Sequence, residues 1–177
     1  MSISFFGMIY QRIMKKRNPV QYWRSRGARI GERCDIYASV SFGSEPYLVK
    51  VGDHVRMTAD VKLITHDGGV WVLRDTDDSL QDVDLFGRIT IGDNVHIGIG
   101  AVIMPGIAIG NNVVIGCGAI VTKNIPDNSI AVGIPARVIE TIDEYKCKHI
   151  DDFVHTSHLR AEDKKKYLIE YLKGSEL

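Results

Sequence analysis

The chain has 177 residues, of which 25% are charged and 45% are hydrophobic, and its 22 Lys and Arg residues balance its 22 Asp and Glu residues. This length and composition predict one globular domain with an apolar core, and the zero net charge gives no reason to expect a nucleic acid partner. The three cysteines lack CxxC spacing and therefore favour a reducing compartment over a disulfide framework. With no transmembrane run and no basic region of a cleaved signal, we expect a cytoplasmic protein.

Residues 4–16 are expected to form a short helix, because apolar residues recur at helical spacing and basic residues follow at its end. The apolar positions are Phe5, Phe6, Ile9, Tyr10, Ile13 and Met14. We interpret this face as a cap over the open end of the domain that follows, with peripheral contact to an anionic membrane as the alternative. Asn18 and Pro19 end the helix, and residues 20–28 lead into the domain.

A period of six residues then governs the chain. One apolar column comprises Ile30, Ile36 and Phe42, then, after three extra residues, Val51, Met57 and Leu63, and later Ile91, Ile97, Ile103, Ile109, Ile115 and Val121. A second apolar column comprises Val95, Ala101, Ile107, Val113, Ala119 and Ile125. A helix repeats near 3.6 residues and a strand near 2, so a register of six predicts a solenoid.

We interpret this solenoid as a parallel β-helix in which each hexad forms one short strand and one turn, and three hexads close a triangular coil. The branched column points into the core, where stacked coils bury equivalent side chains against each other. Polar and glycine positions mark the corners, where we expect the backbone to need positive φ. These positions are Gly92, Gly98, Gly110, Gly116, Asp93-Asn94, Asn111-Asn112 and Lys123-Asn124.

Two segments interrupt or follow the repeat. Residues 67–87 are rich in Asp and contain Trp71 and Phe86, so we expect a long loop that forms a lid or wall of a binding site. Residues 125–142 are expected to leave the solenoid while Ile130, Val132, Ile134, Val138 and Ile139 pack along the coils. Residues 159–173 are expected to form a helix whose Lys run faces water.

The run IGDNVHIGIGAVIMPGIAIGNNVVIGCGAIVTKNIPDNSIAVGIPARVI resembles the hexapeptide-repeat acyltransferases, in particular the C-terminal half of sugar O-acetyltransferases. The segment FGSEPYLVKVGDHVRMTADVKLITHDGG resembles their cell-surface-polysaccharide branch. The resemblance covers residues 30–139 and implies a left-handed parallel β-helix. We therefore expect an N-terminal helix and lead-in at 1–29, the acyltransferase domain at 30–139 and a helical tail at 140–177.

The resemblance implies acetyl transfer from acetyl-CoA to a sugar hydroxyl group, with His66 as the general base. Imidazole suits this task because its pKa lies near neutral pH, so it can take the hydroxyl proton and return it to the leaving thiolate. Register adds Glu45, which follows Phe42 by three residues as His66 follows Leu63, so the two occupy equivalent corners of successive coils. A carboxylate there can orient the imidazole, and Asp67 is the competing candidate.

The resemblance also implies that coenzyme A lies in a groove between subunits of a homotrimer, which agrees with the absence of a deep cleft on a single prism. Its implied contacts are Ile99, Cys117, Thr122, Lys123 and Arg137. Two positions depart from the family pattern, since Glu140 replaces an expected basic residue and His96 replaces a common tryptophan.

Several alternatives remain open. The acceptor could be an amino sugar, which would make the enzyme an N-acetyltransferase, or another small molecule. A protein of a different class would be a β-helix scaffold without catalysis. A zinc site of carbonic-anhydrase type would use His54, His66 and His96, but the HxxxxH pair of those proteins is absent, so we expect no metal.

Overall fold

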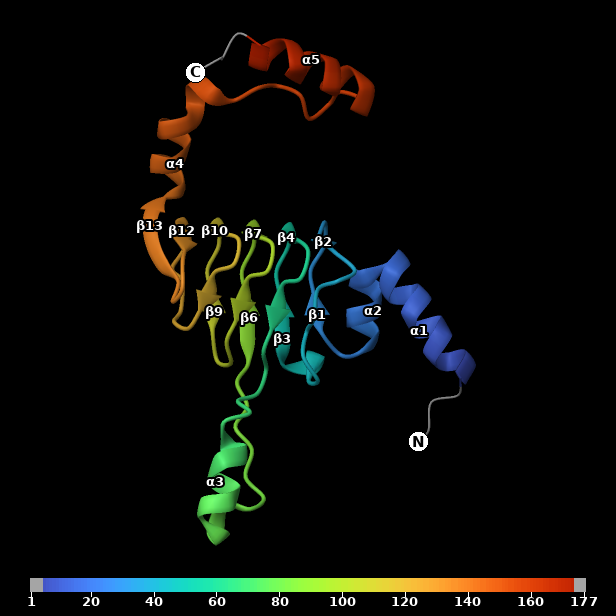
Figure 1. Ribbon diagram of the computed structural model, residues 1–177, viewed down its shortest axis with the longest axis vertical. Coiled ribbons are helices and arrows are strands. Elements are labelled where there is room, and N and C mark those ends of the chain that lie inside the picture. The colour runs from blue at the N-terminus through green and yellow to red at the C-terminus, as the bar shows by residue number, and fades with distance from the viewer. Residues whose placement is uncertain (1–4, 174–177) are drawn as a thin grey trace. The chain divides into compact units, whose positions relative to one another are not determined.

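The computed structural model describes residues 5–173, and these form two compact units that divide after Tyr145. The first unit contains all the named strands, which are arranged in three sheets (Figure 1). Sheet A has the order β1 (Arg29–Ile30), β3 (Val49–Val51), β6 (Ile89–Ile91) and β9 (Ala108–Ile109). Sheet C has the order β11 (Ile120–Val121), β8 (Val102–Ile103) and β5 (Lys62–Leu63).

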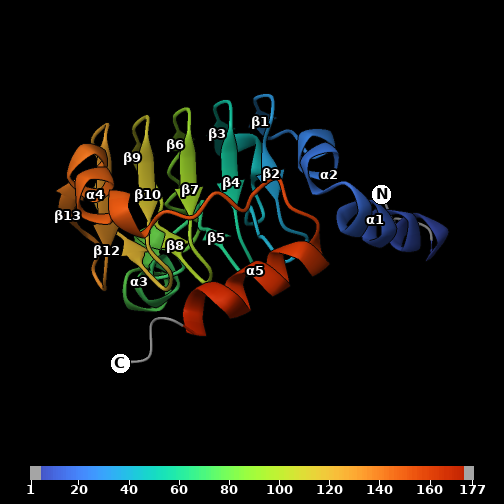
Figure 2. The same ribbon diagram turned by 90° about the horizontal axis from the view of Figure 1, so that it is seen from above.

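Sheet B contains β2 (Asp35–Ile36), β4 (Val55–Met57), β7 (Val95–Ile97), β10 (Val113–Ile115) and β12 (Ser129–Val132) as parallel neighbours. The strand β13 (Arg137–Thr141) adds to β12 in antiparallel orientation. The chain visits sheets A, B and C in the same cyclic order, and Figure 2 shows the strands of successive coils side by side. This parallel, three-sided arrangement is the one that the six-residue period predicts.

The core lies inside the coils and is made from the two predicted apolar columns. Every member of the first column is buried, with at most 8% of its surface exposed, from Ile30 to Val121. The second column is buried equally well, and Ala101 and Ala119 have no exposed surface. Burying each large aliphatic side chain contributes about 1.5–3 kcal/mol relative to leaving it exposed, so the columns are the main source of stability.

The corner between sheets A and B is held by side chains that bind the backbone of the preceding coil. The amide of Asp53 donates to Asp93 Oδ1 at 2.7 Å, and the amide of Asp93 donates to Asn111 Oδ1 at 2.8 Å. The amide of Asn111 donates in turn to Asp127 Oδ1 at 2.7 Å. This corner ladder satisfies amides that a parallel sheet leaves unpaired where its strands end.

The glycines of this corner are required for space rather than for their backbone angle. A Cβ atom on Gly92 would lie 2.6 Å from Asn111 Oδ1 and 2.7 Å from the carbonyl oxygen of Gly110. Positive φ occurs instead two residues later, at Asn94 and Asn112, and at Gly100 and Gly118 of the next corner. The expectation of positive φ is therefore confirmed at Asn94 and Asn112 but wrong at the other positions, namely Gly92, Gly98, Gly110, Gly116 and the Lys123-Asn124 pair. Gly92 and Gly110 allow the close approach of the ladder, whereas a Cβ on Gly98 would lie 2.6 Å from the amide nitrogen of Cys117 and one on Gly116 would lie 2.7 Å from Val132 Cγ1.

Two helices precede the coils, where the sequence predicted one. α1 (Phe5–Arg17) matches the predicted helix, apart from residue 4, which lies outside the described residues. α2 (Pro19–Ser25) was expected to be an irregular lead-in, but Asn18 caps it by accepting from the amide of Gln21 and Pro19 occupies its first turn. Trp23 of α2 is 4% exposed and stacks on Phe42 at 4.8 Å between ring centroids, so α2 supplies the cap that was assigned to the first helix.

The segment between β5 and β6 contains two short helices, α3 (Val70–Thr76) and a 3-10 turn η2 (Asp78–Leu80), where a loop was predicted. Figure 1 shows α3 outside the stack of coils. Arg74 closes this excursion by donating from Nε and Nη2 to the carbonyl oxygen of Val83 and by pairing with Asp84. The exposed apolar residues Trp71, Val72 and Leu73 lie on α3.

The end of the first unit also differs from expectation. Ile125 forms a parallel bridge with Ile109, and β12 pairs with β10, so the chain stays in the solenoid to residue 132. Ile130 is buried as expected, but Ile134, Val138 and Ile139 are 45% or more exposed. The hairpin with β13 explains this, because an antiparallel end strand presents its side chains to the outside rather than to the core.

α4 (Ile142–His149) follows β13 and was not predicted as a separate helix. The second unit holds a 3-10 turn η3 (Ile150–Asp152) and α5 (Ala161–Lys173), which agrees with the predicted final helix except for its first two residues. Lys164, Lys165 and Lys166 are exposed, as expected. Within residues 5–173, no helix combines the length and the apolar character needed to cross a bilayer.

We predict that Gly92→Ala lowers the free energy of unfolding by about 1–3 kcal/mol, because the new methyl group must displace Asn111 and leave the amide of Asp93 unpaired. Gly68→Ala is the matched control, since a Cβ on Gly68 meets no atom within 4 Å. Urea unfolding followed by circular dichroism measures both. Equal stability of the two variants would contradict the steric role of the corner glycines.

Candidate active site

His66 and Glu45 meet at the corner that leads from sheet C to sheet A. His66 lies three residues after Leu63 of β5, and Glu45 directly precedes η1 (Pro46–Leu48), the short turn that leads into β3. His66 Nδ1 lies 3.1 Å from Glu45 Oε2. The stacked coils therefore bring together the two residues that register placed at equivalent corners.

Thr65 is a further member of this cluster that the sequence analysis missed. It has no exposed surface, and its Oγ1 donates to Glu45 Oε2 at 2.6 Å. Gly43 makes room for this contact, because a Cβ there would lie 2.8 Å from Thr65 Oγ1 and because its φ of +66° disfavours other residues. The only sequence signal for Thr65 is its place next to His66 on a strand end, where alternation turns it inward.

The hydroxyl group of Thr65 is the main reason that the pKa of Glu45 lies below its ordinary value. Partial burial opposes this shift, and the contact with His66 Nδ1 supports it. The side chain of Glu45 is 15% exposed, so its carboxylate is held ionised in a partly dry corner. An ionised carboxylate on Nδ1 fixes the imidazole in the tautomer that carries its proton on Nδ1 and leaves Nε2 as an acceptor.

The other side of the imidazole is open. The side chain of His66 is 45% exposed, and Nε2 has no hydrogen-bond partner among the residues that the structure describes. The ring of Phe86 approaches edge-on at 6.2 Å between centroids. The two ends of segment 67–87 meet beside His66. The carbonyl oxygen of Thr65 accepts from the amide of Gly87, and His66 forms an isolated antiparallel β-bridge with Phe86.

Asp67 has a different contact from the one considered for it. Its Oδ1 accepts from the amide of Gly69 at 2.8 Å, and its own amide donates to the carbonyl oxygen of Leu85. Asp67 thus shapes the start of the excursion, while Glu45 is the carboxylate on the imidazole. Asp67 also lines a cavity of about 350 Å³ beside His66, together with Leu85, Phe86, Gly87, Met104, Pro105, Gly106 and Thr122.

The residues expected to contact coenzyme A lie on both edges of sheet C. Ile99 and Cys117 are exposed, and because Ile97 pairs with Ile115, they occupy the same position of successive coils at the corner between sheets B and C. Thr122 and Lys123 follow β11 and lie at the corner that His66 shares, with Thr122 in the cavity. One chain therefore places Thr122 in the same cavity as Asp67, the neighbour of His66, but leaves Ile99 and Cys117 at the opposite edge of sheet C.

Arg137 lies farther along, at the start of β13, where it pairs with Val132 in the hairpin. Its side chain is exposed and Nη1 donates to the carbonyl oxygen of Ala136 at 2.8 Å. A guanidinium at the last coil has the charge and the donors that a phosphate requires. Its remaining N–H groups have no hydrogen-bond partner among the described residues.

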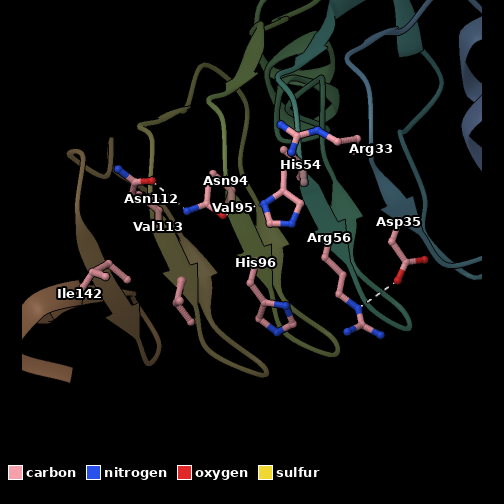
Figure 3. Close-up of a pocket in the computed structure, with 12 residues that line it drawn as sticks. Arg33, Asp35, His54, Arg56, Asn94, Val95, His96, Asn112, Val113 and Ile142 are labelled. Carbon is pink, nitrogen blue, oxygen red and sulfur yellow. Dashed lines mark hydrogen bonds and ion pairs between the residues drawn. The ribbon is translucent and has the colours of Figure 1, made fainter. Parts of the chain in front are cut away.

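A second cavity, of about 420 Å³, lies on the outward side of sheet B (Figure 3). It includes His54 and His96 but not His66, and the pKa of His96 lies below its ordinary value because of burial and the nearby Arg56. His54 Nδ1 contacts Asn94 Oδ1 at 2.8 Å as part of the corner. In the described part of the chain, no three His, Cys, Asp or Glu side chains are grouped so that they could hold a metal ion.

Three comparisons relate this chain to known proteins. Residues 88–123 match the family model for the bacterial transferase hexapeptide of six repeats. Protein CapG of Staphylococcus aureus is 44% identical over 167 residues, which cover 93% of this chain and 95% of that protein. Galactoside O-acetyltransferase of Escherichia coli K12 is 43% identical over 129 residues, covering 71% and 60%. A solved galactoside acetyltransferase in complex with coenzyme A is 30% identical, with a TM-score of 0.58 over 78% of this chain and 80% of that one.

We predict that Thr65→Val raises the pKa of Glu45 toward its ordinary value, because the largest cause of the shift is removed. A lowered carboxyl pKa contributes stability above the pKa of the unfolded chain and loses it as pH falls through the folded pKa. The variant should therefore lose about 1 kcal/mol near neutral pH, and less under acidic conditions. Thr65→Ser keeps the hydroxyl group and is the control. Carboxyl NMR titration of Glu45, with unfolding measured across pH, tests this; equal pKa values in Val and Ser variants would contradict it.

Proposed function

This chain belongs to the bacterial hexapeptide transferase family, and we propose that it transfers an acetyl group from acetyl-CoA to a hydroxyl group of a sugar or a cell-surface polysaccharide precursor. The observation that carries the proposal is the contact of His66 Nδ1 with Glu45 Oε2, which leaves Nε2 without a partner among the described residues. The next residue, Asp67, lines the cavity of about 350 Å³. Acetyl transfer to a sugar is supported by the similarity to the galactoside O-acetyltransferase of Escherichia coli K12 and to the solved galactoside acetyltransferase in complex with coenzyme A.

In the proposed mechanism, His66 Nε2 takes the proton of the acceptor hydroxyl group as its oxygen bonds to the acyl carbon. Glu45 stabilises the imidazolium that forms, because its carboxylate already accepts from Nδ1 and is held ionised by Thr65. The imidazolium then gives the proton to the leaving sulfur as the carbon–sulfur bond breaks, which returns His66 to its neutral form. Acetyl-CoA supplies the activated thioester, and no step here requires a metal.

Coenzyme A is proposed to contact Ile99 and Cys117 through their backbone, with Thr122 and Lys123 nearer the nucleotide and Arg137 near its phosphates. Ile99 and Cys117 lie on the opposite edge of sheet C from His66, so a ligand that touches both sets is best accommodated between two copies of the chain. We therefore propose a homotrimer with three equivalent sites and, from the family, left-handed coils. We predict a cytoplasmic location, with peripheral membrane contact through α1 as the alternative.

We predict that His66→Ala lowers kcat/KM for acetyl transfer by about 10²–10⁴-fold, because the general base is lost. Glu45→Gln should lower it less, since the imidazole remains but its orientation and its charged form are less well stabilised. Release of free thiol from acetyl-CoA, corrected for hydrolysis, measures this with a panel of neutral sugars, amino sugars, nucleotide sugars and glycan fragments. Activity with neutral sugars, which have no amino group, indicates O-acetylation, whereas activity restricted to amino sugars indicates N-acetylation.

His66→Ala changes a side chain that is 45% exposed, so its unfolding curve should match that of the parent protein closely enough to exclude misfolding. Glu45→Gln keeps an acceptor oxygen for Thr65, and its unfolding curve should show that it is folded at the assay temperature. Unchanged activity in His66→Ala would exclude His66 as the base. Absence of thiol release with every acceptor, together with no binding of coenzyme A, would favour the scaffold interpretation instead.

The proposed assembly gives a separate prediction. Light scattering coupled to gel filtration should give a mass three times the chain mass of 19.8 kDa. Mixing His66→Ala subunits with subunits that carry a bulky substitution at Cys117 should restore part of the activity, because one site of a mixed trimer can combine an intact His66 with an intact Cys117. A monomer with full activity would contradict sites between subunits.

A further inference from the structure

The outward side of sheet A carries three exposed cationic residues, Arg29, Lys50 and Arg88, which we call the sheet A cationic cluster. In residues 5–173, the side chains of these three form no ion pair and no hydrogen bond. They line a depression of about 150 Å³ together with Tyr47, Leu48, Val49 and Thr90. No Asp or Glu residue is part of this lining.

The register of the coils makes this arrangement costly. Arg29 and Lys50 are direct neighbours in β1 and β3, so two like charges stand opposite each other across one strand spacing of about 4.8 Å. Sheet B offers a contrast at the same pair of coils, where Asp35 stands opposite Arg56 and pairs with it at 3.1 Å. A like-charge pair without a carboxylate is stabilised when an anion binds between its members.

The sheet A cationic cluster borders the corner that holds the imidazole. Tyr47 lies two residues after Glu45, and Arg88 directly follows Gly87, whose amide donates to the carbonyl oxygen of Thr65. Arg88 precedes Ile89, which pairs with Val49, so it lies at the end of sheet A that faces this corner. On one coil the chain therefore passes from Glu45 to Lys50, and on the next it passes from His66 through segment 67–87 to Arg88.

We propose that the sheet A cationic cluster binds an anionic group, phosphate or carboxylate, on the acceptor sugar whose hydroxyl group His66 deprotonates. This inference rests on the function proposed above and narrows its acceptor to an acidic saccharide. Guanidinium groups bind both kinds of anion through paired N–H donors, and the ammonium group of Lys50 adds a third charge. The depression has room for one such group, while the sugar ring extends toward the corner.

The test compares acetyl transfer to galactose, galactose 1-phosphate and galacturonate at one ionic strength. The variant combines Arg29→Gln, Lys50→Gln and Arg88→Gln, and the matched control combines Lys164→Gln, Lys165→Gln and Lys166→Gln, which removes the same charge from exposed positions of α5. We expect the parent protein to prefer one or both anionic acceptors. The cluster variant should lose about tenfold or more in kcat/KM for those acceptors, mainly through KM, and keep its activity with galactose.

A binding measurement separates this inference from the reaction itself. Inorganic phosphate and free galacturonate should raise the midpoint of thermal unfolding of the parent protein and of the control, relative to sodium chloride at equal ionic strength, but not that of the cluster variant. The two ligands distinguish phosphate from carboxylate. If the parent protein acetylates no acceptor but still shows this shift, the proposed reaction fails while the anion site stands.

The inference is overturned if the cluster variant loses activity equally with galactose and with the anionic sugars, or if neither ligand shifts the midpoint. It is also overturned if the cluster variant differs from the parent protein only in that it no longer sediments with vesicles of anionic phospholipid, since the cluster would then bind a membrane surface. Without added anion the cluster variant should unfold no earlier than the parent protein, because the repulsion between Arg29 and Lys50 is gone. If the triple variant folds poorly, each comparison is repeated with Lys50→Gln alone, which removes one of the two neighbouring charges of Arg29 and Lys50.

Discussion

The stacking of one coil on the next, in register and about one strand spacing apart, is the constraint on which the rest of this structure depends. A residue at a given position of one coil lies against the residue at the same position of the next. Apolar residues repeated in register, such as Ile97 on Ile115, therefore make a continuous core. Polar residues repeated in register, such as Asp93 and Asn111, make a continuous ladder of hydrogen bonds.

The same constraint builds the candidate active site. Glu45 and His66 are 21 positions apart in the chain, yet their side chains meet because the coils place their corners next to each other. This contact could be predicted from the sequence by counting three residues from Phe42 and from Leu63, which are both members of the first apolar column. The contribution of Thr65 could not be predicted, because it depends on the direction of one hydroxyl group and on the space left by Gly43.

The elements that sequence reasoning missed are those outside the period of six. α2 has only seven residues, too few for a helical pattern to be distinguished from a lead-in, and its stability comes from Asn18 at its start and from Trp23 against Phe42. α3 has the same length, and its residue Arg74 has partners that follow nine and ten residues later, Val83 and Asp84. β12 was missed because the apolar column of six-residue spacing ends at Val121, although the backbone pairing continues to residue 132.

The corner glycines show how a correct pattern can carry a wrong cause. Gly92 and Gly110 mark corners as predicted, but the reason is the approach of an Asx side chain from the next coil, a contact that no single hexad reveals. The positive φ falls on Asn94 and Asn112, whose side chains bond to each other at 2.9 Å. A repeat thus predicts where special residues stand more reliably than it predicts which force makes them necessary.

Because the columns and the corners determine the fold, the outward residues of each sheet are free to differ without loss of the core. Sheet B uses this freedom for an ion pair, Asp35 with Arg56, and sheet A places Arg29 against Lys50 at the matching coils. The Arg29–Lys50 neighbours form no ion pair within the described chain. The position next to Lys50 in the same row is occupied by Thr90, so a neutral residue is also compatible with this face of sheet A. A repulsive pair at a position that the fold leaves unconstrained is best explained by a ligand that carries the opposite charge.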